Sequence, residues 1–297
     1  MPSTPPAAPV AYGLALPDLR GAAHLLRRPR GDETLWRVER LLDPDPAPAT
    51  TAVDADRAVL PLAGGRVEID RATATTTFRT PVAPADAEVV HPHLASTAVT
   101  VAHWRGRIAL HAGAVVAGGR VWAVLGERGA GKSTAMYSLV RAGYPLVTDD
   151  VLVLDGRRVL PGPRCVDLRR PTAEHYGVGE DLGVVGRRQR WRVELPAGDG
   201  GGELEHDLEL AGLVHLAWGG EVAVDDVPLD RRWPALLESL ALKLPPADQR
   251  GLLRLLALPT LRFRRPQRFA DLDRAAHALG AELSRRGAAP ATPAAAG

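Results

Sequence analysis

The chain has 297 residues, 45% of them apolar and 24% charged, and its 37 basic residues nearly balance its 35 acidic ones. This is the composition of an ordinary soluble protein, long enough for one large or two small domains. No stretch approaches the ~18 apolar residues of a membrane-spanning helix, and the single cysteine, Cys165, excludes an internal disulfide framework and a cysteine-built metal site. The expected compartment is the cytoplasm.

The N-terminal third is predicted to be β-rich and carries no chemical motif of its own. Residues 1–10 are rich in proline and are expected to be disordered. The β-rich module spans 11–104. Within it, residues 66–70 follow a Gly-Gly pair and alternate like one arm of a hairpin, and residues 73–80 have high β propensity.

The second predicted domain spans residues 105–286. Strand-like apolar runs cover 108–116, 120–125, 145–154 and 208–218. Helices are predicted at 233–243, 247–257 and 269–286, with a strand at 260–263. The tail 287–297 is expected to be disordered.

The most informative stretch of the chain is GERGAGKST, from Gly126 to Thr134, which fits the phosphate-loop pattern G-x-x-x-x-G-K-[ST]. A short apolar strand precedes it and a helix-forming segment follows. Backbone N–H groups and a helix N-terminus therefore surround one anion. The residues expected to bind the nucleotide are Gly126, Arg128, Gly129, Ala130, Gly131, Lys132, Ser133 and Thr134.

A metal bound beside such a loop needs Ser133 and a carboxylate, usually at the end of a neighbouring strand. Asp149 and Asp150 lie inside an apolar run after the loop, where two adjacent carboxylates are costly unless a cation compensates them. The alternative is a strand end at which both acids point to water. We favour metal binding by Ser133, Asp149 and Asp150, with one carboxylate also accepting a proton from an attacking hydroxyl.

Two clusters of arginines interleave with aromatic residues, at 187–192 and 262–268. Such clusters can bind RNA. We favour a solvated face or arginines that serve nucleotide phosphates, because basic and acidic residues are dispersed and nearly balanced elsewhere. His111, in the apolar run LHAGAV, reads on pattern alone as a core residue.

These pieces together resemble the HPr kinase/phosphorylase family. The resemblance rests on LHAGAV with His111, on the loop from Gly126 to Thr134, and on GYPLVTDD ending at Asp150, which follows the family pattern G-x-x-L-x-x-D-D. It is specific over residues 108–154 and loose beyond. It is closer to the shorter relatives that lie beside biosynthetic genes for ribosomal peptides, notably lasso peptides.

The resemblance implies an α/β fold, in which a β-rich N-terminal module precedes a P-loop kinase core of the HPr kinase and phosphoenolpyruvate carboxykinase type. It implies ATP and Mg²⁺ as cofactors and makes His111 an active-site residue. Lys132 would be the phosphate lysine, Ser133 the metal ligand and Asp150 the general base, with Asp149 assisting the metal. The family signature E-x-R-G-x-G is not found here, so a second metal ligand is not assigned.

A basic stretch in the peptide-tailoring relatives corresponds to residues 187–192, so we expect Arg190 or Arg192 to contact phosphate. The predicted function is transfer of the γ-phosphoryl group of ATP to a serine of a peptide or protein, of the lasso type. Two alternatives stay open: a kinase of a small-molecule or carrier-protein hydroxyl, and a nucleotide-binding regulator without transfer activity. A homo-oligomer is allowed, but the hexamer of the larger family members is not carried over.

Overall fold

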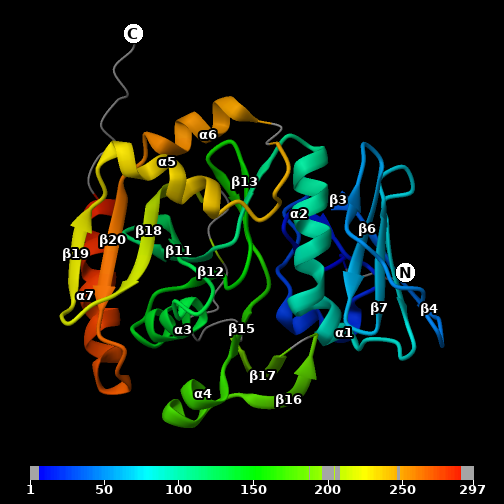
Figure 1. The fold of residues 1–297 in the computed structure, drawn as a ribbon, viewed down its shortest axis with the longest axis horizontal. Helices are drawn as coiled ribbons and strands as arrows, with labels where there is room; N and C mark the ends of the chain where they lie inside the picture. Colours follow the sequence, from blue (N-terminus) through cyan, green and yellow to red (C-terminus); the bar gives the residue numbers. More distant parts are fainter. Residues whose placement is uncertain (1–6, 187, 196–203, 205–207, 246–247, 289–297) are drawn as a thin grey trace, which may run out of the picture.

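The structure is a computed structural model that describes residues 7–186, 188–195, 204, 208–245 and 248–288. It is a mixed α/β protein whose strands form several sheets (Figure 1). No helix in these ranges has both the length and the apolar composition needed to cross a bilayer.

The N-terminal part contains a five-stranded sheet covered on one side by a helix. The strands, in spatial order, are β4 (Arg37–Leu42), β8 (Thr75–Thr80), β7 (Gly65–Asp70), β6 (Arg57–Leu62) and β5 (Ala52–Val53). The hairpin arm and the β-prone segment predicted from the sequence are β7 and β8.

The helix over this sheet, α2 (Leu94–Trp104), was not expected from the sequence. Its buried residues Leu94, Ala98 and Val101 recur at helical spacing and share a core with Phe78 of the sheet. The preceding turns are α1 (Asp86–Glu88) and η2 (Val89–His93). The same core contains Val153, which lies beyond position 104, so the two predicted domains pack against each other.

Short elements precede the sheet. They are β1 (Val10–Ala11), β2 (Leu14–Ala15), the 3₁₀ helix η1 (Arg20–Leu25) and β3 (Thr34–Leu35). Val10, predicted to be disordered, is buried and pairs with Ala15, because its apolar side chain completes this small sheet. Residues 1–6 lie outside the described ranges.

The second part is built on a six-stranded sheet. Its spatial order is β12 (Leu146–Thr148), β10 (Gly113–Ala117), β11 (Arg120–Leu125), β18 (Leu210–Trp218), β20 (Thr260–Arg265) and β19 (Ala223–Asp226). The three strands β11, β18 and β20 are parallel, and the outer strands are antiparallel to their neighbours.

Helices cover both faces of this sheet. They are α3 (Lys132–Arg141) and α7 (Leu272–Gly287) on one face, and α5 (Leu229–Glu238) and α6 (Gln249–Leu256) on the other. Along β11 the side chains alternate between two cores: Trp122 and Val124 pack toward α3 and α7, and Val121 and Ala123 toward α5 and α6. Both faces of β11 are therefore covered, which explains why the strand is apolar from Val121 to Leu125.

Shorter elements complete the described part of the chain. They are β9 (Ile108–Leu110), β13 (Leu152–Asp155), β14 (Arg158–Leu160), β15 (Cys165–Leu168), α4 (Arg170–Tyr176), β16 (Glu180–Val185), β17 (Arg188–Glu194) and the 3₁₀ turn η3 (Phe269–Asp271).

Several boundaries differ from the sequence predictions. The predicted strand 108–116 is broken into β9 and β10 at His111 and Ala112, and the predicted helix 233–243 is found as α5, Leu229–Glu238. The predicted strand 145–154 is broken into β12 and β13, since Asp149 and Asp150 leave the sheet between them. At the C-terminus, the predicted disordered tail begins too early: Gly287 is the last residue of α7 and packs against the backbone of Gly118. Residues 289–297 lie outside the described ranges.

Candidate active site

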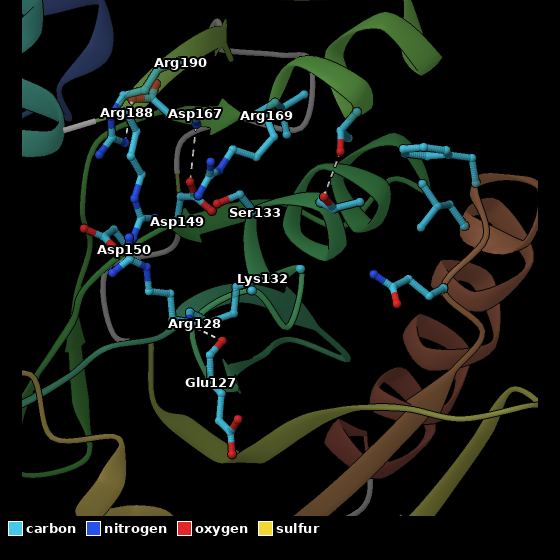
Figure 2. Close-up of a pocket in the computed structure, with 18 of the residues that line it drawn as sticks. Glu127, Arg128, Lys132, Ser133, Asp149, Asp150, Asp167, Arg169, Arg188 and Arg190 are labelled. Carbon is cyan, nitrogen blue, oxygen red and sulfur yellow. Dashed lines mark hydrogen bonds and ion pairs between the residues drawn. The ribbon is translucent and has the colours of Figure 1, made fainter. Parts of the chain in front are cut away.

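The glycine-rich segment after β11 leads directly into the N-terminus of the ten-residue helix α3. Gly129 and Gly131 have φ angles of +92° and +77°, a region in which side-chain-bearing residues are strained. The segment opens onto a cavity of about 730 Å³ (Figure 2). The cavity lies at the carboxyl end of β11, the usual place for ligands in open α/β sheets.

This cavity brings together most of the residues predicted from the sequence, namely His111, Arg128, Gly129, Gly131, Lys132, Ser133, Thr134, Asp149, Asp150 and Arg190. Gly126 and Ala130 belong to the same loop without lining this cavity.

Arg265 of β20 stabilises the loop through hydrogen bonds to its backbone. Its Nη2 donates to the carbonyl oxygens of Ala130, at 2.6 Å, and Gly131, at 3.3 Å. The guanidinium lies 4.5 Å from the ring centroid of Trp218, and burial lowers its pKa to about 10. The loop is thus fixed by a tertiary contact as well as by its glycines.

Lys132 points across the loop. Its Nζ donates to the carbonyl oxygen of Gly126 at 2.6 Å, and burial lowers its pKa, opposed by Asp150 and Asp149. The ammonium group therefore lies within the curve of the loop, beside the first turn of α3, where the N–H groups and the helix dipole also favour an anion.

Asp149 is the most perturbed carboxylate of the cavity. It is 5% exposed; Oδ2 accepts from the Asp167 backbone N–H at 3.3 Å, and Oδ1 has no partner in the described part of the chain. Burial raises its pKa to about 8, with the charges of Asp150 and Asp167 adding to the shift and the Ser133 hydroxyl opposing it. Figure 2 shows Ser133 beside this carboxylate.

An orphaned, buried carboxylate oxygen next to a hydroxyl fits a cation. Within the described ranges, no cluster of three or more His, Cys, Asp or Glu residues forms a metal cage. Mg²⁺ does not require one, because it is commonly held by one or two protein ligands together with substrate phosphates and water. Asp149 and Ser133 therefore fit Mg²⁺ that arrives with a phosphate ligand.

Asp150 faces the other way, toward His111. His111 Nδ1 lies 3.3 Å from Asp150 Oδ1, and the two side chains are 48% and 34% exposed. Burial lowers the pKa of His111, opposed by Asp150, so the imidazole is neutral near pH 7. The Asp150 carboxylate thus lies beside the His111 imidazole and lines the cavity.

The rest of the fold holds both aspartates in place. The Thr148 hydroxyl donates to the carbonyl oxygen of Val151 at 2.8 Å, closing the turn that carries them. Arg27, from the N-terminal part, donates to the carbonyl oxygen of Leu146 at 2.7 Å. The N-terminal part therefore supports the turn between β12 and β13.

Three unpaired guanidinium groups also line the cavity. Arg128, Arg169 and Arg188 make no side-chain hydrogen bond or ion pair with any residue that the structure describes. Burial lowers the pKa of Arg188, and the charges of Arg128, Arg169 and Arg190 lower it further. Arginines that repel one another around an empty volume are typical of a site for a multiply charged anion.

Arg190 lines the cavity as predicted, and its Nη1 pairs with Asp167 Oδ2 at 3.2 Å. The prediction for Arg192 is wrong. Its guanidinium is buried away from the cavity and donates to Asp167 Oδ1 at 2.9 Å, to the Ala87 carbonyl oxygen at 2.7 Å and to that of His91. These bonds hold the Arg192 side chain in the interior, and Arg192 does not line the cavity.

Asp167 and Arg169 were missed by sequence reasoning, and Arg188 was not selected from its cluster. The sequence does contain a pattern that could have indicated Asp167 and Arg169. Asp167-Leu168-Arg169 has the acid-x-Arg spacing with which E-x-R-G-x-G begins, with Asp in place of Glu and without the glycines that follow.

No protein-family model and no curated protein matches the chain. A solved structure titled as the Hpr(Ser) kinase/phosphatase from Coxiella burnetii aligns with a TM-score of 0.30 and 13% sequence identity, covering 60% of this chain and 97% of that chain. A TM-score this low does not establish a shared fold.

Replacing Arg192 tests the buried network. We expect Arg192→Ala to lower the free energy of unfolding by about 3–5 kcal/mol, because it leaves the Asp167 carboxylate without its main buried partner. The matched control is Arg170→Ala, which removes an exposed pair with Glu174 and should cost less than about 1 kcal/mol. Urea denaturation measures both; equal losses would contradict the assignment.

The pKa of Asp149 predicts a pH dependence of stability in the metal-free protein. The folded protein holds this proton up to about pH 8, whereas the unfolded chain releases it near the ordinary value of 3.8. Stability should therefore fall as the pH rises from about 4 to about 8. In Asp149→Asn, this part of the decline should disappear from calorimetric Tm values measured in EDTA.

The exposed control Asp230→Asn should follow the wild-type curve. If Asp149→Asn and the wild type show the same slope of Tm against pH, the Asp149 carboxyl does not carry the shift.

Proposed function

We propose that this protein is an ATP-dependent kinase that transfers the γ-phosphoryl group to a serine hydroxyl of a peptide or protein. One observation carries the proposal: a single cavity holds the glycine-rich loop with Lys132, the orphaned Asp149 carboxylate beside Ser133, and the Asp150–His111 pair. These are the parts that phosphoryl transfer needs, which are charge neutralisation, positioning and a base.

The phosphates of ATP would lie on the N-terminus of α3. The loop N–H groups and Lys132 bind the phosphate oxygens, and the unpaired guanidinium groups of Arg128, Arg169 and Arg188 neutralise further charge. The aromatic rings of Trp218 and Phe269, which line the same cavity, offer apolar surface to the nucleoside.

Ser133 and Asp149 would hold Mg²⁺. When bound, the ion neutralises the charge that develops on the phosphate oxygens. Binding also requires Asp149 to lose its proton, so the raised pKa of this carboxyl makes the site more receptive to a cation as the pH rises.

Asp150 would act as the base. Its carboxylate accepts the proton of the serine hydroxyl as that oxygen forms a bond to the γ-phosphorus and the bond to the β–γ bridging oxygen breaks, releasing ADP. His111, whose Nδ1 lies 3.3 Å from this carboxylate, would stay neutral and so add no competing charge.

A regulator that only binds nucleotide would need neither Asp150 nor His111, so the pair favours a transferase. The choice of a serine in a peptide, of the lasso type, follows the sequence resemblance to kinases of ribosomal peptide biosynthesis. A small-molecule or carrier-protein acceptor would use the same residues.

Substitution of the base separates transfer from binding. We expect Asp150→Asn to reduce the rate constant of transfer by about 10²- to 10⁴-fold, the usual contribution of a general base, with little change in the KM for ATP. Lys132→Ala should instead weaken ATP binding. The measurement is transfer of label from γ-labelled ATP to candidate peptides and small molecules, with products identified by mass spectrometry.

Asp155→Asn is the matched control, since Asp155 lies on β13 outside the cavity and pairs with Arg107 at 2.7 Å. Full transfer activity in Asp150→Asn would show that the base is a different group.

A further inference from the structure

The cavity that contains the phosphate loop has two chemically different ends. The strand order β12–β10–β11–β18–β20 places the turn after β12 on one side of the loop, and the ends of β18 and β20 on the other (Figure 1). Because β12, β11, β18 and β20 run in the same direction, their carboxyl ends meet at this cavity. Asp149 and Asp150 therefore lie on one side of the loop, and Trp218 and the segment after β20 lie on the other.

The end toward β20 is mostly apolar and aromatic. Among the described residues its lining includes one basic side chain and no acidic one, and consists of Trp218, Pro266, Gln267, Arg268, Phe269 and Leu272. The basic residue, Arg268, already pairs with Asp271 at 2.8 Å. This end therefore suits an uncharged ring better than a phosphate group.

Phe269, the first residue of η3, forms a platform at this end. Its ring stacks on the ring of His175 in α4, with centroids 4.9 Å apart and planes inclined by 25°. Stacking occupies one face of the phenyl ring, yet Phe269 remains 43% exposed and lines the cavity. An aromatic ring that is held from one side and open to a cavity can stack on a further planar group.

Hydrogen bonds between α3 and α4 fix this platform relative to the phosphate loop. The Thr172 hydroxyl of α4 lies 3.1 Å from the Thr134 hydroxyl, in the first turn of α3. One helical turn further along each helix, the Tyr176 hydroxyl lies 2.9 Å from the Ser138 hydroxyl. The helix that carries His175 is thus attached to the helix whose N-terminus favours an anion, so the fold sets the spacing between the platform and the phosphate loop.

Trp218 provides an apolar wall between the loop and the platform. It is the last residue of β18, the strand between β11 and β20, and it is 42% exposed. Its indole lies so close to the loop that a Cβ atom on Gly131 would be 3.3 Å from Cη2 of the ring. A ligand that reaches from the loop to Phe269 therefore passes Trp218.

We propose, on the basis of the kinase function above, that the nucleotide lies across the carboxyl ends of these strands, with its base stacked on Phe269 and its γ-phosphate toward Asp150. A nucleobase is a planar ring with the π face that aromatic side chains stack on. In this orientation the sugar passes Trp218, and the phosphates lie on the loop N–H groups and Lys132. His175 is a positioning residue, because it contacts Phe269 and not the base.

The test compares two ligands that share the phosphates and differ in the base: ATP and inorganic tripolyphosphate, each titrated with Mg²⁺ in a calorimeter. Phe269→Ala should weaken the binding of ATP about 5- to 150-fold, as expected for the loss of one stacked base, and leave that of tripolyphosphate within about twofold. Phe269→Tyr should keep the affinity for ATP, because it keeps the ring. His175→Ala should lose part of the affinity for ATP and none of that for tripolyphosphate.

Trp233→Ala is the matched control, since Trp233 is an aromatic residue of α5 that is 41% exposed and lies outside this cavity. The proposal is overturned if Phe269→Ala binds ATP as tightly as Trp233→Ala does, or if Phe269→Ala weakens ATP and tripolyphosphate equally. Failure of the kinase function gives a different result: ATP binding that depends on Phe269, without transfer of phosphate to any acceptor.

Discussion

The buried carboxylate of Asp149 imposes the strongest constraint on this molecule. A carboxylate that is 5% exposed, with one oxygen unpaired and two other aspartates nearby, is unfavourable when ionised unless positive charge reaches it. The fold nevertheless maintains it, through the Asp167 backbone N–H and the closed turn between β12 and β13. Such a group is understandable as a site that is completed by a cation arriving with its ligand.

Three cationic groups of the cavity also lack ion-pair partners among the described residues. Lys132 and the N-terminus of α3 favour an anion, and Arg128, Arg169 and Arg188 point toward it without partners of their own. The cavity therefore combines cationic side chains with two aspartates, an arrangement that suits a polyanion accompanied by a divalent cation. Arg190 and Arg192, in contrast, neutralise Asp167. Arg192 also attaches the sheet of β15, β16 and β17 to the N-terminal part by donating to the carbonyl oxygens of Ala87 and His91.

The phosphate loop and the Asp149–Asp150 pair could be predicted from the sequence pattern, and His111 was added through the family resemblance, whereas Asp167, Arg169 and Arg188 were not selected. The loop from Gly126 to Thr134 could be recognised because its glycines, its lysine and the helix that follows it are adjacent in the sequence. On β17, however, Arg188, Arg190 and Arg192 are two residues apart and therefore lie on the same face of the strand. The sequence alone does not show which end of the strand reaches the cavity. The strand enters at Arg188 and leads Arg192 into the interior. The hydrogen bond from Arg265 to the loop and the helix α2 could likewise not be predicted from the sequence, since both depend on contacts between distant segments.

We infer that Asp149 and Ser133 complete a divalent-cation site only when a nucleotide occupies the loop. Titration with Mn²⁺ in place of Mg²⁺, followed by electron paramagnetic resonance with and without a non-hydrolysable ATP analogue, tests it most directly. The account predicts one tightly held Mn²⁺ per chain in the presence of the analogue, and its loss in Asp149→Asn. Equal Mn²⁺ binding by the wild type and Asp149→Asn, or no Mn²⁺ bound with the analogue present, would contradict it.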